Sequence, residues 1–117
     1  MFEVSGRSIR ISRGDTVLIA FDAEGTALSE KDLAVFTVRR QNGGIAMEKV
    51  IAPEGNRLLV PFTNEETEAL REGEYVWDIR VVLDAETDAE GRVTGGREVI
   101  TPLPPSPMRI MKVVGRV

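Results

Sequence analysis

Residues 73–83 read Gly-Glu-Tyr-Val-Trp-Asp-Ile-Arg-Val-Val-Leu, and they include the only tryptophan and the only tyrosine of the chain. Every second residue from Tyr75 to Leu83 is apolar, whereas Asp78 and Arg80 lie on the opposite face with two valines. Because side chains of a β-strand alternate between the two faces of its sheet, an apolar face of this size must lie against a second layer. The segment therefore predicts the central strand of a β-sandwich.

The residues just before this strand have the spacing of a tyrosine corner, with Leu70, Gly73 and Tyr75 in sequence. In that motif the tyrosine hydroxyl bonds to the backbone a few residues upstream, near the turn that leads into the strand. We expect Tyr75 to make this bond. The motif is structural and specifies no chemistry.

Length and composition are those of one globular domain, so we expect residues 1–117 to form a single domain. With 42% hydrophobic and 29% charged residues, the chain has enough apolar side chains for a core and is not a disordered sequence. The absence of cysteine excludes disulfides and thiolate metal sites, and the absence of histidine removes the commonest general base and metal ligand. The net charge of −4 disfavours a nucleic-acid partner.

No segment has the character of a membrane or export sequence. Residues 1–7 lack the apolar region of a signal peptide, and no run approaches the roughly 18 apolar residues of a membrane span. We therefore expect a soluble protein that has no membrane partner and is made in a reducing cytoplasm.

Short alternating or β-branched segments, each bounded by turn residues, predict about eight strands. Besides the central strand they cover residues 2–11 with a kink, 16–22, 33–40, 45–51, 57–62, 92–101 and 108–114. Thr63 followed by Glu66 forms a capping box, which predicts a short helical turn near residues 64–70. The predicted core consists of Phe21, Phe36, Val38, Leu58, Val60, Tyr75, Trp77 and Ile79.

The C-terminal region begins with a proline-rich segment at 102–107, which lacks the amide donors of a paired strand. It predicts an extended crossover that delivers residues 108–114 as a terminal strand at a sheet edge. Edge strands present unpaired backbone groups, so this strand is the expected contact of a homo-oligomer or of a neighbouring protein.

Three motifs suggest ligands, and each has a simpler structural interpretation. Arg13-Gly14-Asp15 matches a tripeptide that integrins bind, but Gly and Asp are also ordinary turn residues before a strand. The acidic loop at 84–91 offers oxygen ligands for calcium, although it lacks the glycine and final glutamate of an EF-hand. Trp77 has the chemistry of a sugar-stacking platform, but it shares a face with core residues. We predict that Arg13-Gly14-Asp15 is a turn, that the acidic loop is a solvated hairpin tip and that Trp77 is a core residue. We therefore predict no catalytic, cofactor-binding or metal-binding residues and no cofactor.

An ordered series of short motifs resembles a known protein family. The series runs from Arg13-Gly14-Asp15-Thr16 through Phe36-Thr37-Val38-Arg39, then Glu66-Thr67 with Leu70, to Gly73-x-Tyr75-x-Trp77-Asp78-Ile79, and it ends with Thr101-Pro102 before the closing strand. It is similar to the small immunoglobulin-like proteins of phage and prophage tails and baseplates, including the N-terminal domain of baseplate upper proteins. The chain departs from the family in having Trp77 where tyrosine is usual and in its longer acidic loop.

The resemblance implies an immunoglobulin-like antiparallel β-sandwich that serves assembly rather than catalysis. It implies a virion structural protein, made in the bacterial host cytoplasm, whose partners are other tail or baseplate proteins. The alternative is a bacterial surface or adhesion module that recognises a glycan or a protein, and an accessory domain of an enzyme is a third possibility. No catalytic residue is carried over from the family.

Overall fold

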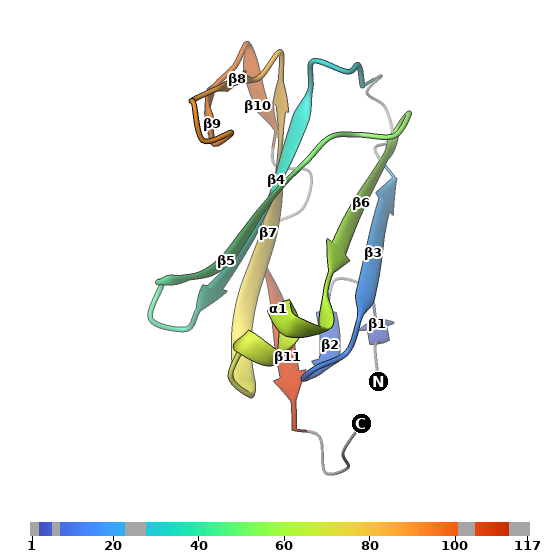
Figure 1. Cartoon of the computed structure of the whole chain (residues 1–117), viewed down its shortest axis with the longest axis vertical. Helices are drawn as coiled ribbons and strands as arrows, with labels where there is room; N and C mark the ends of the chain where they lie inside the picture. The colour runs from blue at the N-terminus through green and yellow to red at the C-terminus, as the bar shows by residue number, and fades with distance from the viewer. Residues whose placement is uncertain (1–2, 6–7, 23–27, 101–104, 113–117) are drawn as a thin grey trace.

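The fold is an all-β sandwich with one short helix, in a computed structural model that describes residues 3–5, 8–22, 28–100 and 105–112 (Figure 1). The larger layer is a sheet whose strands follow the order β1 (Glu3–Ser5), β2 (Ser8–Ser12), β11 (Ser106–Met111), β7 (Gly73–Leu83), β4 (Leu33–Arg40) and β5 (Ile45–Ile51). A further strand of this sheet, β10 (Glu98–Ile100), pairs with β7. The smaller layer pairs β3 (Val17–Asp22) with β6 (Arg57–Phe62). A hairpin of β8 (Glu86–Thr87) and β9 (Val93–Gly95) projects from one end of the larger sheet, and helix α1 (Asn64–Ala69) joins β6 to the start of β7 (Figure 1).

Strand β7 is the central strand, as its alternating sequence predicts. It pairs with β4 from Leu33 opposite Val82 to Arg40 opposite Tyr75, and with β11 and β10 on its other side. Its inward side chains are buried against the β3–β6 layer. This 11-residue strand, paired on both sides, forms the frame to which the rest of the fold is attached.

The core is built around Trp77, which is 1% exposed. Its ring stacks on Phe36 at a centroid distance of 5.4 Å and contacts Phe21 at the same distance. Seven of the eight predicted core residues are buried, and the eighth, Phe21, is partly buried and packs against the same cluster. The core prediction is therefore confirmed, with Phe21 at its margin.

Two local motifs take the predicted form. The Tyr75 hydroxyl donates to the carbonyl oxygen of Arg71 at 2.6 Å, which closes the tyrosine corner. The hydroxyl of Thr63 accepts from the backbone N–H of Glu66, and the carboxylate of Glu66 accepts from the backbone N–H of Thr63. This capping box starts α1 one residue after Thr63.

The C-terminal strand is not at an edge, so that prediction was wrong. Strand β11 lies between β2 and β7, parallel to β2 with Met108 opposite Ile9 and antiparallel to β7 with Ser106 opposite Trp77. Its inward Met108 and Ile110 are buried in the hydrophobic core that this sheet shares with β3 and β6. The sheet is therefore mixed, with one parallel pair among otherwise antiparallel pairs.

Several predicted boundaries also change. The segment at 102–107 is not entirely a crossover, because β11 already begins at Ser106; residues 101–104, and the predicted strand end at 113–114, lie outside the described residues. The kinked first strand consists of two paired strands, β1 and β2. The predicted return strand at 92–101 divides into β9 and β10 around Gly96, where a Cβ atom would lie 2.5 Å from Val82 Cγ1. The described residues thus form eleven strands rather than about eight.

Candidate functional site

The outer face of the larger sheet, defined as the face turned away from β3 and β6, is the candidate functional site. Strand registry assigns its side chains, since Asp78 lies opposite Thr37 and Arg80 opposite Val35 on β4, and Thr37 lies opposite Glu48 on β5. These residues alternate with the buried ones along each strand. The outer face comprises Val35, Thr37, Arg39, Ile45, Glu48, Val50, Val76, Asp78, Arg80, Val82 and Val99.

The β8–β9 hairpin makes this face concave. Figure 1 shows the hairpin projecting to the side of the sheet opposite β3 and β6. A groove of about 310 Å³ lies between Thr94 and Gly95 of the hairpin segment and Asp78 and Arg80 of β7. Val82, at the hairpin end of the groove, is only 4% exposed although it points away from the core.

The groove and its surroundings combine apolar side chains with charges of both signs. Arg80 and Glu48 are exposed and Asp78 is half-buried, and none of the three makes an ion pair within the described part of the chain. Val99, Ile45 and Val50 expose 53%, 50% and 39% of their surface on the same face. A concave surface of this composition can bind another protein surface through apolar contact and ion pairs.

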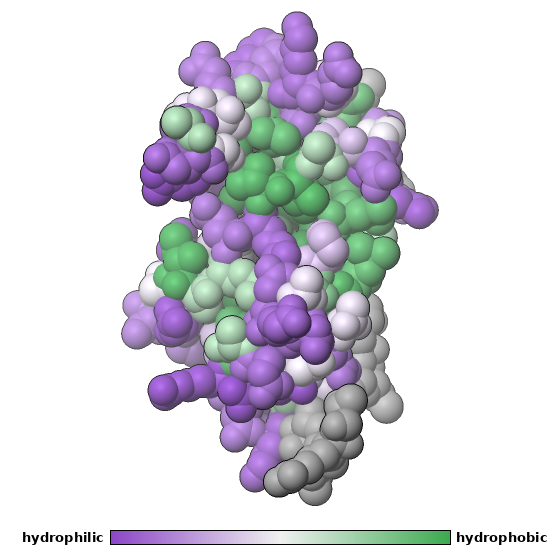
Figure 2. Space-filling view, in the orientation of Figure 1, coloured by the Kyte–Doolittle hydropathy of each residue, from purple (hydrophilic) through white to green (hydrophobic). Residues whose placement is uncertain are grey.

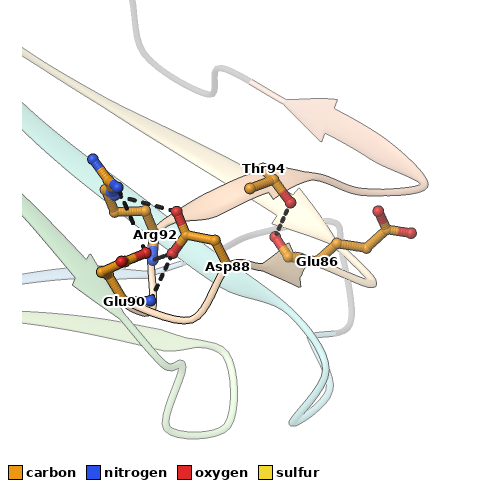
Figure 3. A network of polar contacts seen from close by, with 5 residues as sticks. All are labelled: Glu86, Asp88, Glu90, Arg92 and Thr94. Atoms are coloured by element: carbon orange, nitrogen blue, oxygen red, sulfur yellow. Dashed lines mark hydrogen bonds and ion pairs between the residues drawn. The ribbon is translucent and has the colours of Figure 1, made fainter.

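The acidic loop is a hairpin tip in which three of the four carboxylates, those of Asp84, Asp88 and Glu90, have arginine partners. Asp88 accepts from the backbone N–H groups of Glu90 and Arg92, and the Arg92 side chain pairs with Asp88 at 3.2 Å and with Glu90 at 3.6 Å (Figure 3). The carboxylate of Glu86 points away from this network, and Asp84 pairs with Arg97 at 2.9 Å. Among residues 8–22, 28–100 and 105–112, no group of three or more acidic side chains is placed to hold a metal ion.

The Arg13-Gly14-Asp15 segment is a turn, as predicted. The N–H of Asp15 donates to the carbonyl of Ser12, and Gly14 has a φ of 90°, a conformation that favours glycine. The Arg13 side chain packs against α1, where its Nε donates to the carbonyl oxygen of Glu68 at 2.9 Å. The segment thus attaches β2 and β3 to the helix.

Aromatic side chains take no part in the outer face. Trp77 is buried, so its interpretation as a sugar-stacking platform is wrong. The other aromatic residues with described side chains (Phe21, Phe36, Phe62 and Tyr75) are buried or packed against the core. Figure 2 shows apolar side chains gathered over the upper half of the view.

Two buried polar residues that the sequence does not predict, Thr67 and Asp32, hydrogen-bond to the backbone of distant loops. Thr67 accepts from the N–H of Gly14 through its hydroxyl oxygen and donates to the carbonyl of Asp15 at 2.7 Å. Asp32 accepts from the N–H of Ser29 at 2.7 Å and from the N–H of Asp84 at 2.9 Å. These backbone hydrogen bonds lower the pKa of Asp32, against the opposing effect of its burial. Both residues hold loops in place, and no local sequence pattern marks either one.

The free edge of β5 carries a charged residue that points inward. Lys49 forms an ion pair with Glu66 of α1 at 2.6 Å, and its ammonium group lies 5.4 Å from the ring centroid of Phe62. Partial burial favours a higher pKa of Glu66, but the hydrogen bonds from Lys49 and Thr63 outweigh it and the pKa is lowered. An inward lysine on an edge strand hinders edge-to-edge pairing with another sheet.

Comparison of the chain with protein-family models found no matching family, and comparison with curated proteins found no matching relative. Within the described ranges, no helix has the length and apolar character needed to cross a bilayer.

Proposed function

We propose that this protein is a non-catalytic assembly component of a phage or prophage tail or baseplate. It is made in the cytoplasm of the bacterial host, becomes part of the virion, and binds other tail or baseplate proteins. The proposal starts from the motif series that resembles immunoglobulin-like tail and baseplate proteins.

One observation supports a role in assembly: the motifs that carry the resemblance build the fold. Gly14 and Asp15 bond to Thr67, Tyr75 bonds to the backbone at Arg71, and Trp77 packs on Phe36. If these motifs served a reaction, we would expect their side chains to lie together around a pocket. The side chains of these motifs instead lie in the core and where α1 contacts the turn at residues 13–15.

The outer face supplies the binding surface that such a component requires. It combines exposed valine and isoleucine side chains with unpaired charges around a groove of about 310 Å³. Protein interfaces are built from such mixtures of apolar contacts and polar rims. The alternative, a surface module that recognises a glycan, would be favoured by aromatic side chains at the groove, and its lining residues include none.

The test is mass spectrometry of phage particles that are induced from the host strain and purified on a density gradient. We expect the protein to remain with the particles in a fixed ratio to a major tail protein through successive purification steps. Its absence from particles, together with its presence on washed host cells and its release by a specific glycan, would contradict the proposal and favour the adhesion module. A cytoplasmic host protein of similar size serves as the control for contamination.

A further inference from the structure

The outer face concentrates the exposed apolar side chains of the described residues. Four large hydrophobic side chains of the described residues are exposed, namely Leu18, Ile45, Val50 and Val99. Three of them lie on the outer face, and Leu18 lies alone on β3. Ile45, Val50 and Val99 lie at separate points of this face, so each gives a second protein surface an apolar contact around the charged residues at its centre.

Two opposite charges at the centre of this face, Asp78 and Arg80, are placed so that two copies of the face can pair with each other. Asp78 and Arg80 are two residues apart on the same side of β7, so a two-fold axis across the strand at Ile79 would exchange their positions. A second copy placed face to face about this axis would bring Asp78 of each copy opposite Arg80 of the other. The two ion pairs would form together because the contact is isologous.

The two ends of the face are also complementary. Arg10 and Arg109 are register partners near the beginning of β7, where Arg109 lies opposite Glu74. The hairpin at the other end of β7 carries Glu86, which is exposed and whose carboxylate points away from the Asp88–Arg92 network (Figure 3). The same two-fold axis would place each acidic hairpin over the arginine-bearing end of the second copy, where opposite charges favour the antiparallel arrangement.

The size of the face suits a dimer. Strand β7 has 11 residues, and five strands from β2 to β5 lie side by side. At a rise of about 3.3 Å per residue and a spacing of about 4.8 Å, the five strands together cover roughly 600 Å², which is at the lower end of the area that each partner buries in a standard interface. Edge pairing through β11 or β5 is less suitable, because β11 is an interior strand and β5 carries the inward Lys49.

We infer that a second copy of this chain packs on the outer face, antiparallel to the first, with Asp78 of each copy paired to Arg80 of the other. The dimer buries Ile45, Val50 and Val99 and seats each hairpin at the arginine end of its neighbour. This inference rests on the outer face being the binding surface of the proposed function and names its partner as a second copy. Self-association and presence in particles are measured separately, so the failure of one is distinguishable from the failure of the other.

The experiment is sedimentation velocity on the full chain from micromolar to millimolar concentration. We expect the wild type to change from the mass of one chain to twice that mass as concentration rises. Asp78→Arg and Arg80→Asp should each remain monomeric, because each places like charges opposite one another. An equimolar mixture of the two variants should form a heterodimer, since every charge at the axis then meets its opposite.

Matched controls separate this contact from general charge effects. Asp22 and Arg57 form an exposed ion pair at 3.4 Å on the β3–β6 layer, and the same reversals there should leave association unchanged. Native Trp77 emission checks that every variant is folded, and Arg80→Asp, at an exposed position, tests the contact if Asp78→Arg does not fold. A wild type that stays monomeric at every concentration would overturn the inference. So would a dimer insensitive to both reversals, or a mixture of the folded variants that does not associate.

Discussion

At the scale of single residues, Thr67 joins helix α1 to the turn at residues 13–15. Its side chain is fully buried, and its hydroxyl oxygen accepts from Gly14 and donates to Asp15. Replacing the hydroxyl by a methyl group in Thr67→Val keeps the shape and the helix propensity but leaves these backbone groups without their partner. We expect a loss of about 1–3 kcal/mol in the free energy of unfolding, measured by urea denaturation.

Thr87 on β8 provides the matched control for Thr67, because it is exposed and makes no side-chain hydrogen bond within the described residues. Thr87→Val should change the free energy of unfolding by less than about 0.5 kcal/mol. Equal effects of the two substitutions would contradict the role assigned to Thr67.

Trp77 is the largest fully buried side chain of the described residues, and its ring packs against those of Phe21 and Phe36, which also contact each other. Truncation in Trp77→Ala removes these contacts and leaves a cavity, so we expect the free energy of unfolding to fall by about 3–5 kcal/mol, followed by far-ultraviolet circular dichroism. Emission of the native wild type should be blue-shifted, and a spectrum like that of indole in water would contradict the burial. Leu18→Ala, at a residue that is 58% exposed, should cost far less.

At the scale of elements, Asp32 ties the turn before β4 to the end of β7. Its pKa is lowered in the folded state by hydrogen bonds from the N–H groups of Ser29 and Asp84. A carboxyl group with a lowered folded pKa stabilises the protein above its unfolded pKa of about 3.9, and this contribution is lost as pH falls through the folded value. Asp32→Asn should therefore be destabilising near neutral pH, and its difference from the wild type should shrink below about pH 4.

Urea denaturation at neutral and acidic pH tests the role of Asp32. The control is Asp22→Asn, because Asp22 is exposed and its carboxylate forms a surface ion pair with Arg57. That substitution should change the free energy of unfolding by less than about 1 kcal/mol. A difference between Asp32→Asn and the wild type that stays constant down to acidic pH would contradict the linkage.

At the scale of the whole molecule, one hydrophobic cluster includes residues from both layers, from Ile9 on β2 to Ile110 on β11. A chain with one shared core should unfold in a single cooperative transition, in keeping with the prediction that residues 1–117 form one domain. We expect tryptophan emission and far-ultraviolet circular dichroism to give the same midpoint in urea. Two separated midpoints would indicate independently folding parts.

The sequence by itself determined the features that depend on neighbouring residues. Alternation of side chains along 73–83, the capping box at Thr63 and the tyrosine corner at Tyr75 are local patterns, and the structure has all three. The burial of Trp77 followed from the same alternation, because its face of the strand is apolar throughout.

Only the tertiary structure decided which strands meet. The placement of β11 between β2 and β7, the hydrogen bonds of Thr67 and Asp32, and the groove beneath the hairpin each join residues far apart in the chain. The apolar alternation of β11 is the same at an edge as in the interior, so it could not reveal the strand's neighbours. Pairing between distant strands depends on how the whole core closes, and a local pattern specifies which face of a strand is buried but not which strand lies beside it.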